Sequence, residues 1–245
     1  MRRDAAANSA HWGLWGTVAW SALIAAVFVA AQTVVVALLA SQVEASPSEL
    51  ERFFGSAEEN GYLISLATLA TTLACCTLIA IIVKLKRGAR LADYLALQPV
   101  AAATLFNWVA VLAVFVAASD LLTWSLGRPI VPEFMSNTYA TARPVWLFWL
   151  ALIAAAPLFE EAFFRGFLFK SFAASFMGPV GAIMVSTLFW AVLHLQYDAY
   201  GIVTIFVLGL LLGAARAATG SLYVPLVLHA LANLVATIET AIAVR

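Results

Sequence analysis

Charged residues are scarce in this chain. Of its 245 residues only 11% are Asp, Glu, Lys or Arg, whereas 64% are hydrophobic, and the mean hydropathy is +0.98. A soluble domain of this size needs more polar surface to face water, so that class is excluded. The formal net charge is zero, and without a basic excess we expect no nucleic-acid partner.

Cysteine is also scarce, and the familiar metal-binding and nucleophile motifs are missing. The only two cysteines, Cys75 and Cys76, are adjacent within an apolar run, and no CxxC pattern exists. Two such neighbours cannot form an ordinary disulfide with each other there, so we interpret both as packing residues. The sequence contains no HExxH helix and no GxSxG elbow, and therefore gives no support to a familiar zinc helix or a serine nucleophile.

Long apolar runs recur along the whole chain. They predict an all-α polytopic transmembrane helical bundle of about seven spans in one domain. The first run is longer than the apolar region of a cleavable signal, which has roughly 7–15 residues, so it predicts a retained span. Residues 1–143 are expected to form spans one to three with their loops, and residues 144–245 the core that carries the ionisable groups. The expected spans are about 15–40, 61–83, 100–126, a fourth from 144, 180–195, 202–218 and 222–243.

Charge asymmetry between loops predicts the orientation. Arg2, Arg3 and the basic residues of 84–90 flank the first two spans on one side, and the segment 41–60 on the other side is acidic. The positive-inside rule then places the N-terminus in the cytoplasm. We expect an integral protein of the plasma (inner) membrane.

Three ionisable residues interrupt the predicted fourth span, at Glu160, Glu161 and Arg165. A charged side chain at the bilayer centre costs roughly 2.5–3.5 kcal/mol on insertion scales, so three together predict a function. Glu161 and Arg165 are four apart and can pair on one helix face. Glu160 lies about 100° around the helix and stays available for proton transfer. The alternative is a structural salt bridge with a spare glutamate.

Only three histidines occur, and two of them fall within predicted spans. His11 lies in the polar N-terminal segment and is expected to have no role. Glu160 and His194 are equally distant from the turn near Met177, about 25 Å along their helices, and so at the same height. His229 lies about 13 Å beyond the Gly220 turn, whose depth the sequence leaves open.

A carboxylate, two imidazoles and a carboxamide could converge from these spans. Glu160 could deprotonate a water that His194 helps to hold, while His229 and Asn233 donate hydrogen bonds to the oxyanion of a tetrahedral intermediate. Equally, Glu160, His194 and His229 could bind zinc with a water in the open position. Both schemes stay open at this stage.

Small residues recur every four positions in the predicted sixth span, at Gly209, Gly213 and Ala217. Such a stripe lets another helix approach closely, and we interpret it as a packing feature.

Three ordered motifs resemble one family of intramembrane proteases. Residues 160–166 (EEAFFRG) resemble the EExxxR motif of the CAAX-processing and bacteriocin-processing (CPBP or Abi) family, which includes the type II CAAX prenyl proteases. Residues 190–194 (WAVLH) resemble its FxxxH motif with Trp190 in place of Phe, and residues 229–233 (HALAN) match HxxxN. The resemblance covers roughly residues 144–235, and the first three spans show only generic membrane character.

The resemblance implies an intramembrane endopeptidase that cuts a peptide bond near the cytoplasmic side. Its substrate would be a membrane-anchored peptide, a prenylated CAAX terminus or a bacteriocin-like peptide, so the expected partners are membrane lipid and a peptide or protein, lipidated or not. By the resemblance Glu160 activates water, Glu161 and Arg165 support it, His194 assists at the water or a metal, and His229 with Asn233 forms the oxyanion site. The resemblance leaves zinc open as a cofactor.

Two other classes remain as alternatives. A non-catalytic immunity or scaffold protein could keep the fold and bind a partner without cutting it. A proton-coupled transporter could use buried Glu and His as a relay, although such transporters often have two similar halves and no internal repeat is visible here.

Overall fold

The structure, a computed structural model, describes residues 11–42 and 46–245, and in those residues the regular structure is entirely helical. The predicted all-α polytopic bundle is therefore confirmed. Arg2, Arg3 and Glu44, which contribute to the predicted orientation, lie outside the described residues. The long helices are α2 (Leu14–Ala40), α4 (Gly61–Leu85), α6 (Ala102–Ser125), a continuous helix over Val145–Ala173, α12 (Ala199–Thr219) and α13 (Tyr223–Ala243).

Within the described residues, six helices are long and apolar enough to cross a membrane. The seventh apolar segment, predicted as a span over about 180–195, is the 15-residue helix α11 (Gly178–Val192). At about 1.5 Å per residue it is roughly 22 Å long, shorter than a hydrocarbon core of about 30 Å. It ends two residues before His194, which therefore lies in a connecting loop. The prediction that His194 lies inside a span is wrong.

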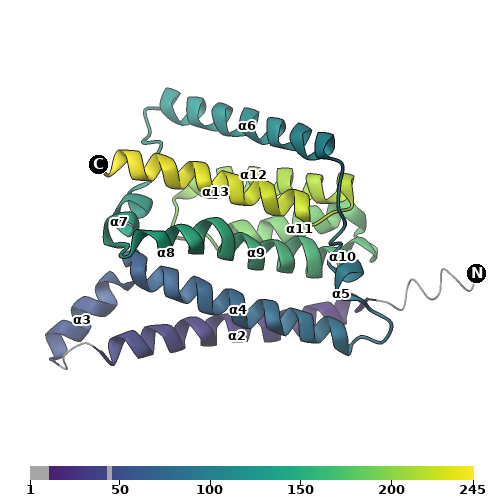
Figure 1. The fold of residues 1–245 in the computed structure, drawn as a ribbon, viewed down its shortest axis with the longest axis horizontal. Coiled ribbons are helices and arrows are strands. Elements are labelled where there is room, and N and C mark those ends of the chain that lie inside the picture. The colour runs from purple at the N-terminus through teal and green to yellow at the C-terminus, as the bar shows by residue number, and fades with distance from the viewer. Residues whose placement is uncertain (1–10, 43–45) are drawn as a thin grey trace, which may run out of the picture.

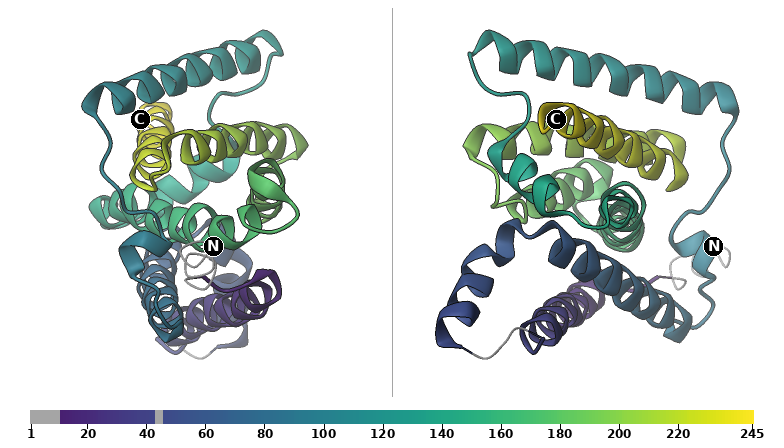
Figure 2. Two further views of the ribbon diagram at one scale, coloured as in Figure 1. Left: turned by 90° about the vertical axis from the view of Figure 1, so that its right-hand side faces the viewer. Right: turned by 60° about the vertical axis from the view of Figure 1, so that its left-hand side comes forward.

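The long helices run side by side in layers (Figures 1 and 2). α2 packs on α4 at one edge, and α6 covers α12 and α13 at the other. Between these edges lies the helix of residues 145–173, which contacts α4 on one side and α13 on the other. This central position surrounds its ionisable residues with protein.

Short helices lie in segments expected to be loops. They are α3 (Pro47–Ser56) with the 3₁₀ turn η1 (Ala57–Glu59), α5 (Leu91–Tyr94) and α7 (Glu133–Thr141). Figure 1 shows α3, α7 and the C-terminus at one end of the bundle, and α5 and the start of α2 at the other. The basic residues 84–90 thus lie at the end opposite the acidic α3 region, and the placement of the N-terminus in the cytoplasm stays a prediction.

The central helix changes its hydrogen-bond pattern twice. It consists of α8 (Val145–Leu150), the π-helical turn η2 (Ala151–Ala155), α9 (Ala156–Glu161), the π-helical turn η3 (Ala162–Leu168) and α10 (Phe169–Ala173). Pro157 has no backbone N–H and cannot complete the regular ladder, so a local π adjustment keeps the helix continuous. π turns often occur at functional sites, and these two flank the glutamate pair.

α12 approaches its neighbours closely through glycine. A Cβ atom on Gly209 would lie 2.7 Å from Thr187 and 2.9 Å from Trp190, and one on Gly213 would lie 2.8 Å from Ile183. These contacts support the predicted packing role of the small-residue stripe. They bring the backbone of α12 against α11 beside the glutamate pair.

Candidate active site

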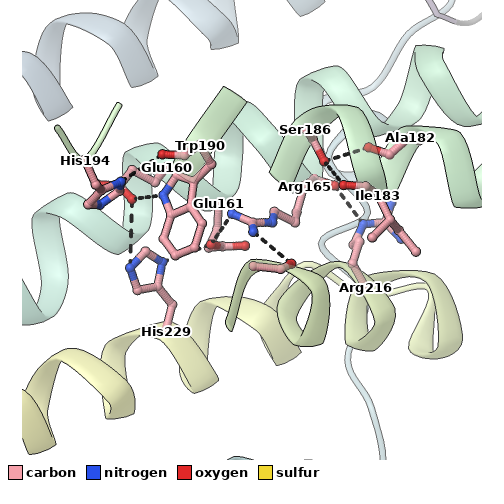
Figure 3. A network of polar contacts seen from close by, with 11 residues as sticks. Glu160, Glu161, Arg165, Ala182, Ile183, Ser186, Trp190, His194, Arg216 and His229 are labelled. Atoms are coloured by element: carbon pink, nitrogen blue, oxygen red, sulfur yellow. Dashed lines mark hydrogen bonds and ion pairs between the residues drawn. The ribbon is translucent and has the colours of Figure 1, made fainter. Parts of the chain in front are cut away.

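Residues from four segments form one polar network (Figure 3). Glu160 and Glu161 end α9, Arg165 lies in η3, and His229 comes from α13. Trp190 lies near the C-terminal end of α11, and His194 follows in the loop. The structure therefore brings together five of the six residues predicted for the site, and adds Trp190 to them.

The inner end of the network is sealed. Arg165 Nη1 donates to Glu161 Oε1 at 3.0 Å, and both side chains are 0% exposed. Arg165 Nη2 donates to the carbonyl of Gly209 at 3.1 Å. The sequence prediction of an ion pair at four-residue spacing agrees with this geometry. A buried pair with few other partners is costly to break, because removal of one member leaves the other charge unpaired.

His229 joins the sealed end to an open end. Its Nδ1 lies 2.9 Å from Glu161 Oε1, and since an ionised carboxylate only accepts, Nδ1 carries the proton. Its Nε2 lies 3.9 Å from Glu160 Oε2, and the Glu160 side chain is 22% exposed. Glu160 is thus the carboxylate that water and a substrate can reach.

His194 has one ring nitrogen engaged and one directed elsewhere. Its Nδ1 lies 2.8 Å from the carbonyl of Trp190 and donates to it, because a carbonyl only accepts. Nε2 therefore carries a lone pair that can accept a proton or a hydrogen bond from water. The ring centroid lies 5.0 Å from that of Trp190, whose indole contacts Glu160. This agrees with the predicted common height of Glu160 and His194.

The depth of His229 depends on how the turn before α13 is held. Leu222 donates its backbone N–H to the carbonyl of Ala96 at 2.8 Å, and the Ser221 hydroxyl donates to the carbonyl of Gln98 at 2.6 Å. These bonds tie the turn to the segment after α5. Only six residues beyond the start of α13, His229 therefore reaches Glu161 near the middle of the central helix.

Asn233 does not contact the carboxylates. Its Nδ2 donates to the carbonyl of Leu152 at 2.8 Å, within the π turn η2. The amide thus joins α13 to the central helix two turns before Glu160. One of its two amide protons is used there, and the other is available for a further acceptor.

Sequence reasoning missed two residues at this site. The Trp190 indole Nε1 donates a short hydrogen bond to Glu160 Oε2, which the spacing of the motif gave no means to foresee. The Tyr197 ring lies near that of His194, tilted by 34° with centroids 6.4 Å apart, and meets Phe134 of α7 edge-on. Burial, with a smaller contribution from the Glu160 carboxylate, raises the pKa of the Tyr197 phenol to about 12, so its O–H stays a donor at neutral pH.

His11, expected to have no role, lies away from this network. Its Nδ1 is 2.9 Å from the carbonyl of Trp12.

The donor set has the chemistry of a zinc site but not its geometry. Glu160, His194 and His229 offer one carboxylate and two imidazoles, and both imidazoles direct Nδ1 at an acceptor, as metal-bound histidines do. Among the described residues, however, no three His, Cys, Asp or Glu side chains lie where they could hold a metal ion. As arranged, these groups do not fit an ion.

Comparison with known proteins relates the segment that holds this site to one family. Residues 142–235 match the family described as "Type II CAAX prenyl endopeptidase Rce1-like". Over this segment the chain is similar to that family. The matched segment contains every residue predicted for the site, together with both π turns. The resemblance drawn from the three motifs is confirmed.

A curated relative matches part of the chain. This chain is 33% identical to an Escherichia coli protein named "Uncharacterized 24.3 kDa protein" over 126 residues, which are 49% of this chain. The match covers 57% of that relative's length. The comparison with solved structures gave no match.

Proposed function

We propose that this protein is an intramembrane endopeptidase in which Glu160 activates the water that attacks a peptide bond. The observation that carries the proposal is the difference between the adjacent glutamates: Glu161 is sealed in an ion pair, whereas Glu160 is partly exposed beside two histidines. A general base must reach the proton it removes, and only Glu160 can meet water.

The reaction then follows in two proton transfers. Glu160 removes a proton from water while His194 Nε2 accepts the second water hydrogen bond, and the hydroxide attacks the scissile carbonyl carbon. The resulting oxyanion accepts hydrogen bonds from Nε2 of a doubly protonated His229 and from the second amide proton of Asn233. Glu160 returns its proton to the leaving amine as the C–N bond breaks, so the carboxylate is restored.

The substrate is a membrane-associated peptide or protein. The site lies near the middle of a helix long enough to cross a bilayer, so the scissile bond must enter the membrane region. The family description names prenyl endopeptidases, and a lipidated C-terminal peptide is one substrate of this class. A membrane-anchored or bacteriocin-like peptide has the same access to the site. With the N-terminus in the cytoplasm, the basic end of the bundle faces the cytoplasm.

The test is cleavage of a membrane peptide library by the purified protein in liposomes. Glu160→Gln should abolish cleavage, and the matched control Glu239→Gln, a half-buried glutamate of α13 outside the network, should cleave normally. A parallel sample with chelator, followed by added Zn²⁺, tests a metal requirement directly. Cleavage by Glu160→Gln at the wild-type rate would overturn the proposal. Specific peptide binding without cleavage by any variant would favour a scaffold protein of the same fold.

A further inference from the structure

Trp190 lies against four residues of the candidate site, which are Glu160, Arg165, His194 and His229. Its side chain is 2% exposed, and the Arg165 guanidinium carbon lies 4.7 Å from the centre of its ring. The rings of His194 and His229 meet it edge-on, with centroids 5.0 and 5.3 Å away. Gly209 makes room for it, since a Cβ there would lie 2.9 Å from the indole.

The indole also holds the exposed carboxylate. Trp190 Nε1 donates to Glu160 Oε2, and within residues 11–42 and 46–245 this is the one hydrogen bond that Glu160 receives from a side chain. The nearest histidine nitrogen, His229 Nε2, is 3.9 Å away, beyond hydrogen-bond distance. A carboxylate with a single donor has its orientation set by that donor.

The motif that this segment resembles has Phe at this position, and Phe has no N–H. A phenyl ring could pack against the histidines and over Arg165, but it could not orient Glu160. Trp190 can pack as a phenyl ring would and also donates a hydrogen bond.

We propose that Trp190 is a positioning residue that fixes the Glu160 carboxylate through its indole N–H, so that the free carboxylate oxygen faces the attacking water. This inference rests on the proposed function of Glu160. A hydrogen bond to a charged group and the alignment it provides affect the transition state more than substrate binding. Loss of the donor with the ring kept should therefore act on turnover.

The kinetic test uses Trp190→Phe. We expect kcat to fall about 10- to 100-fold with KM nearly unchanged. The matched control is Trp149→Phe, in the central helix and outside the network. It removes an indole N–H that donates to the Tyr139 hydroxyl at 3.4 Å. It should keep the wild-type kcat. An unchanged kcat in Trp190→Phe would overturn the proposal, as would a fall in both variants alike.

A spectroscopic test needs no substrate and no folded Trp190 variant. In ¹⁵N-tryptophan-labelled protein, the indole resonance of Trp190 should lie downfield, because a carboxylate is a stronger acceptor than an amide. Glu160→Gln should move that resonance upfield, and Glu239→Gln should leave it in place. A resonance that does not respond to Glu160→Gln would overturn the contact.

The two tests separate this inference from the proposed function. The proposed function and the positioning role both stand if three results are found together. Glu160→Gln is inactive, the Trp190 indole resonance shifts in that variant, and Trp190→Phe loses turnover. If Glu160→Gln cleaves normally, the proposed function fails, and a resonance shift then reports a structural contact alone, which overturns the positioning role.

Discussion

The polar network has a sealed end and an open end, and adjacent residues of one helix occupy them. At the sealed end Glu161 and Arg165 are 0% exposed, and His229 adds a third partner. At the open end Glu160 is 22% exposed and receives one indole hydrogen bond. A change of about 100° around the helix separates a carboxylate that holds the helices together from one that can meet water.

This difference indicates how a membrane protein can carry a reactive carboxylate. The insertion cost of a charged cluster is offset at the sealed end, where Arg165 supplies the opposite charge and α12 supplies a backbone acceptor. At the open end the Glu160 carboxylate then needs only local orientation, and the Trp190 indole N–H is its side-chain donor. Variants at each end should therefore fail in different ways.

The largest effect is expected from Arg165→Ala, which leaves Glu161 charged and buried without its partner. The free energy of unfolding should fall by about 3–5 kcal/mol, and folded yield and activity should fall with it. Thermal denaturation and size-exclusion chromatography in detergent measure both. The control Arg128→Ala removes a partly exposed arginine paired with Asp198 and should leave the yield normal. Normal yield and thermal stability in Arg165→Ala would show that the sealed end does not support the fold.

An intermediate effect is expected from Asn233→Ala, the predicted site residue whose amide contacts the Leu152 carbonyl. Turnover should fall by about 10²-fold with little change in KM, because one oxyanion donor is lost. The control Thr237→Ala removes a buried hydroxyl one turn along α13, whose bond to the Asn233 carbonyl is 2.6 Å long. It should retain turnover. A rise in KM equal to the fall in turnover would instead assign Asn233 to substrate binding.

The smallest effect is expected from Asp198→Asn, a carboxylate outside the network. The Gly201 N–H, with a smaller contribution from Arg128, lowers the pKa of Asp198 below its ordinary value. Its contribution to stability is therefore present above about pH 3.9 and is lost as pH falls through the lower folded-state pKa. The melting temperature of Asp198→Asn should lie slightly below wild type at pH 7 and converge with it in acid. A gap that persists in acid would exclude the charge as its cause.

The helical fold could be predicted because apolar runs of this length have few other solutions. The Glu161–Arg165 pair could be predicted because four-residue spacing is a local property of a helix. Helix ends were less predictable, because the length of α11 depends on where the chain turns toward α12. His194 was predicted to lie in a span, and it lies in the loop after α11.

The contacts between helices could not be predicted from spacing. His229 meets Glu161 because the turn before α13 is tied to Ala96 and Gln98, which are distant in sequence. Likewise, the register of α11 against the central helix decides that the Trp190 indole meets Glu160. Asn233 was expected beside His229 at the oxyanion. Its observed partner is the Leu152 carbonyl, whose position depends on the π turn η2, and the sequence did not predict that turn.

The most direct measurement compares Glu160→Gln with Glu161→Gln for both turnover and melting temperature. Glu160→Gln should keep the wild-type melting temperature and lose about 10²- to 10⁴-fold in turnover. Glu161→Gln should lower the melting temperature strongly, because Arg165 is left buried without its carboxylate partner. An active Glu160→Gln, or a stable Glu161→Gln that has lost turnover alone, would contradict the division between the open and the sealed carboxylate.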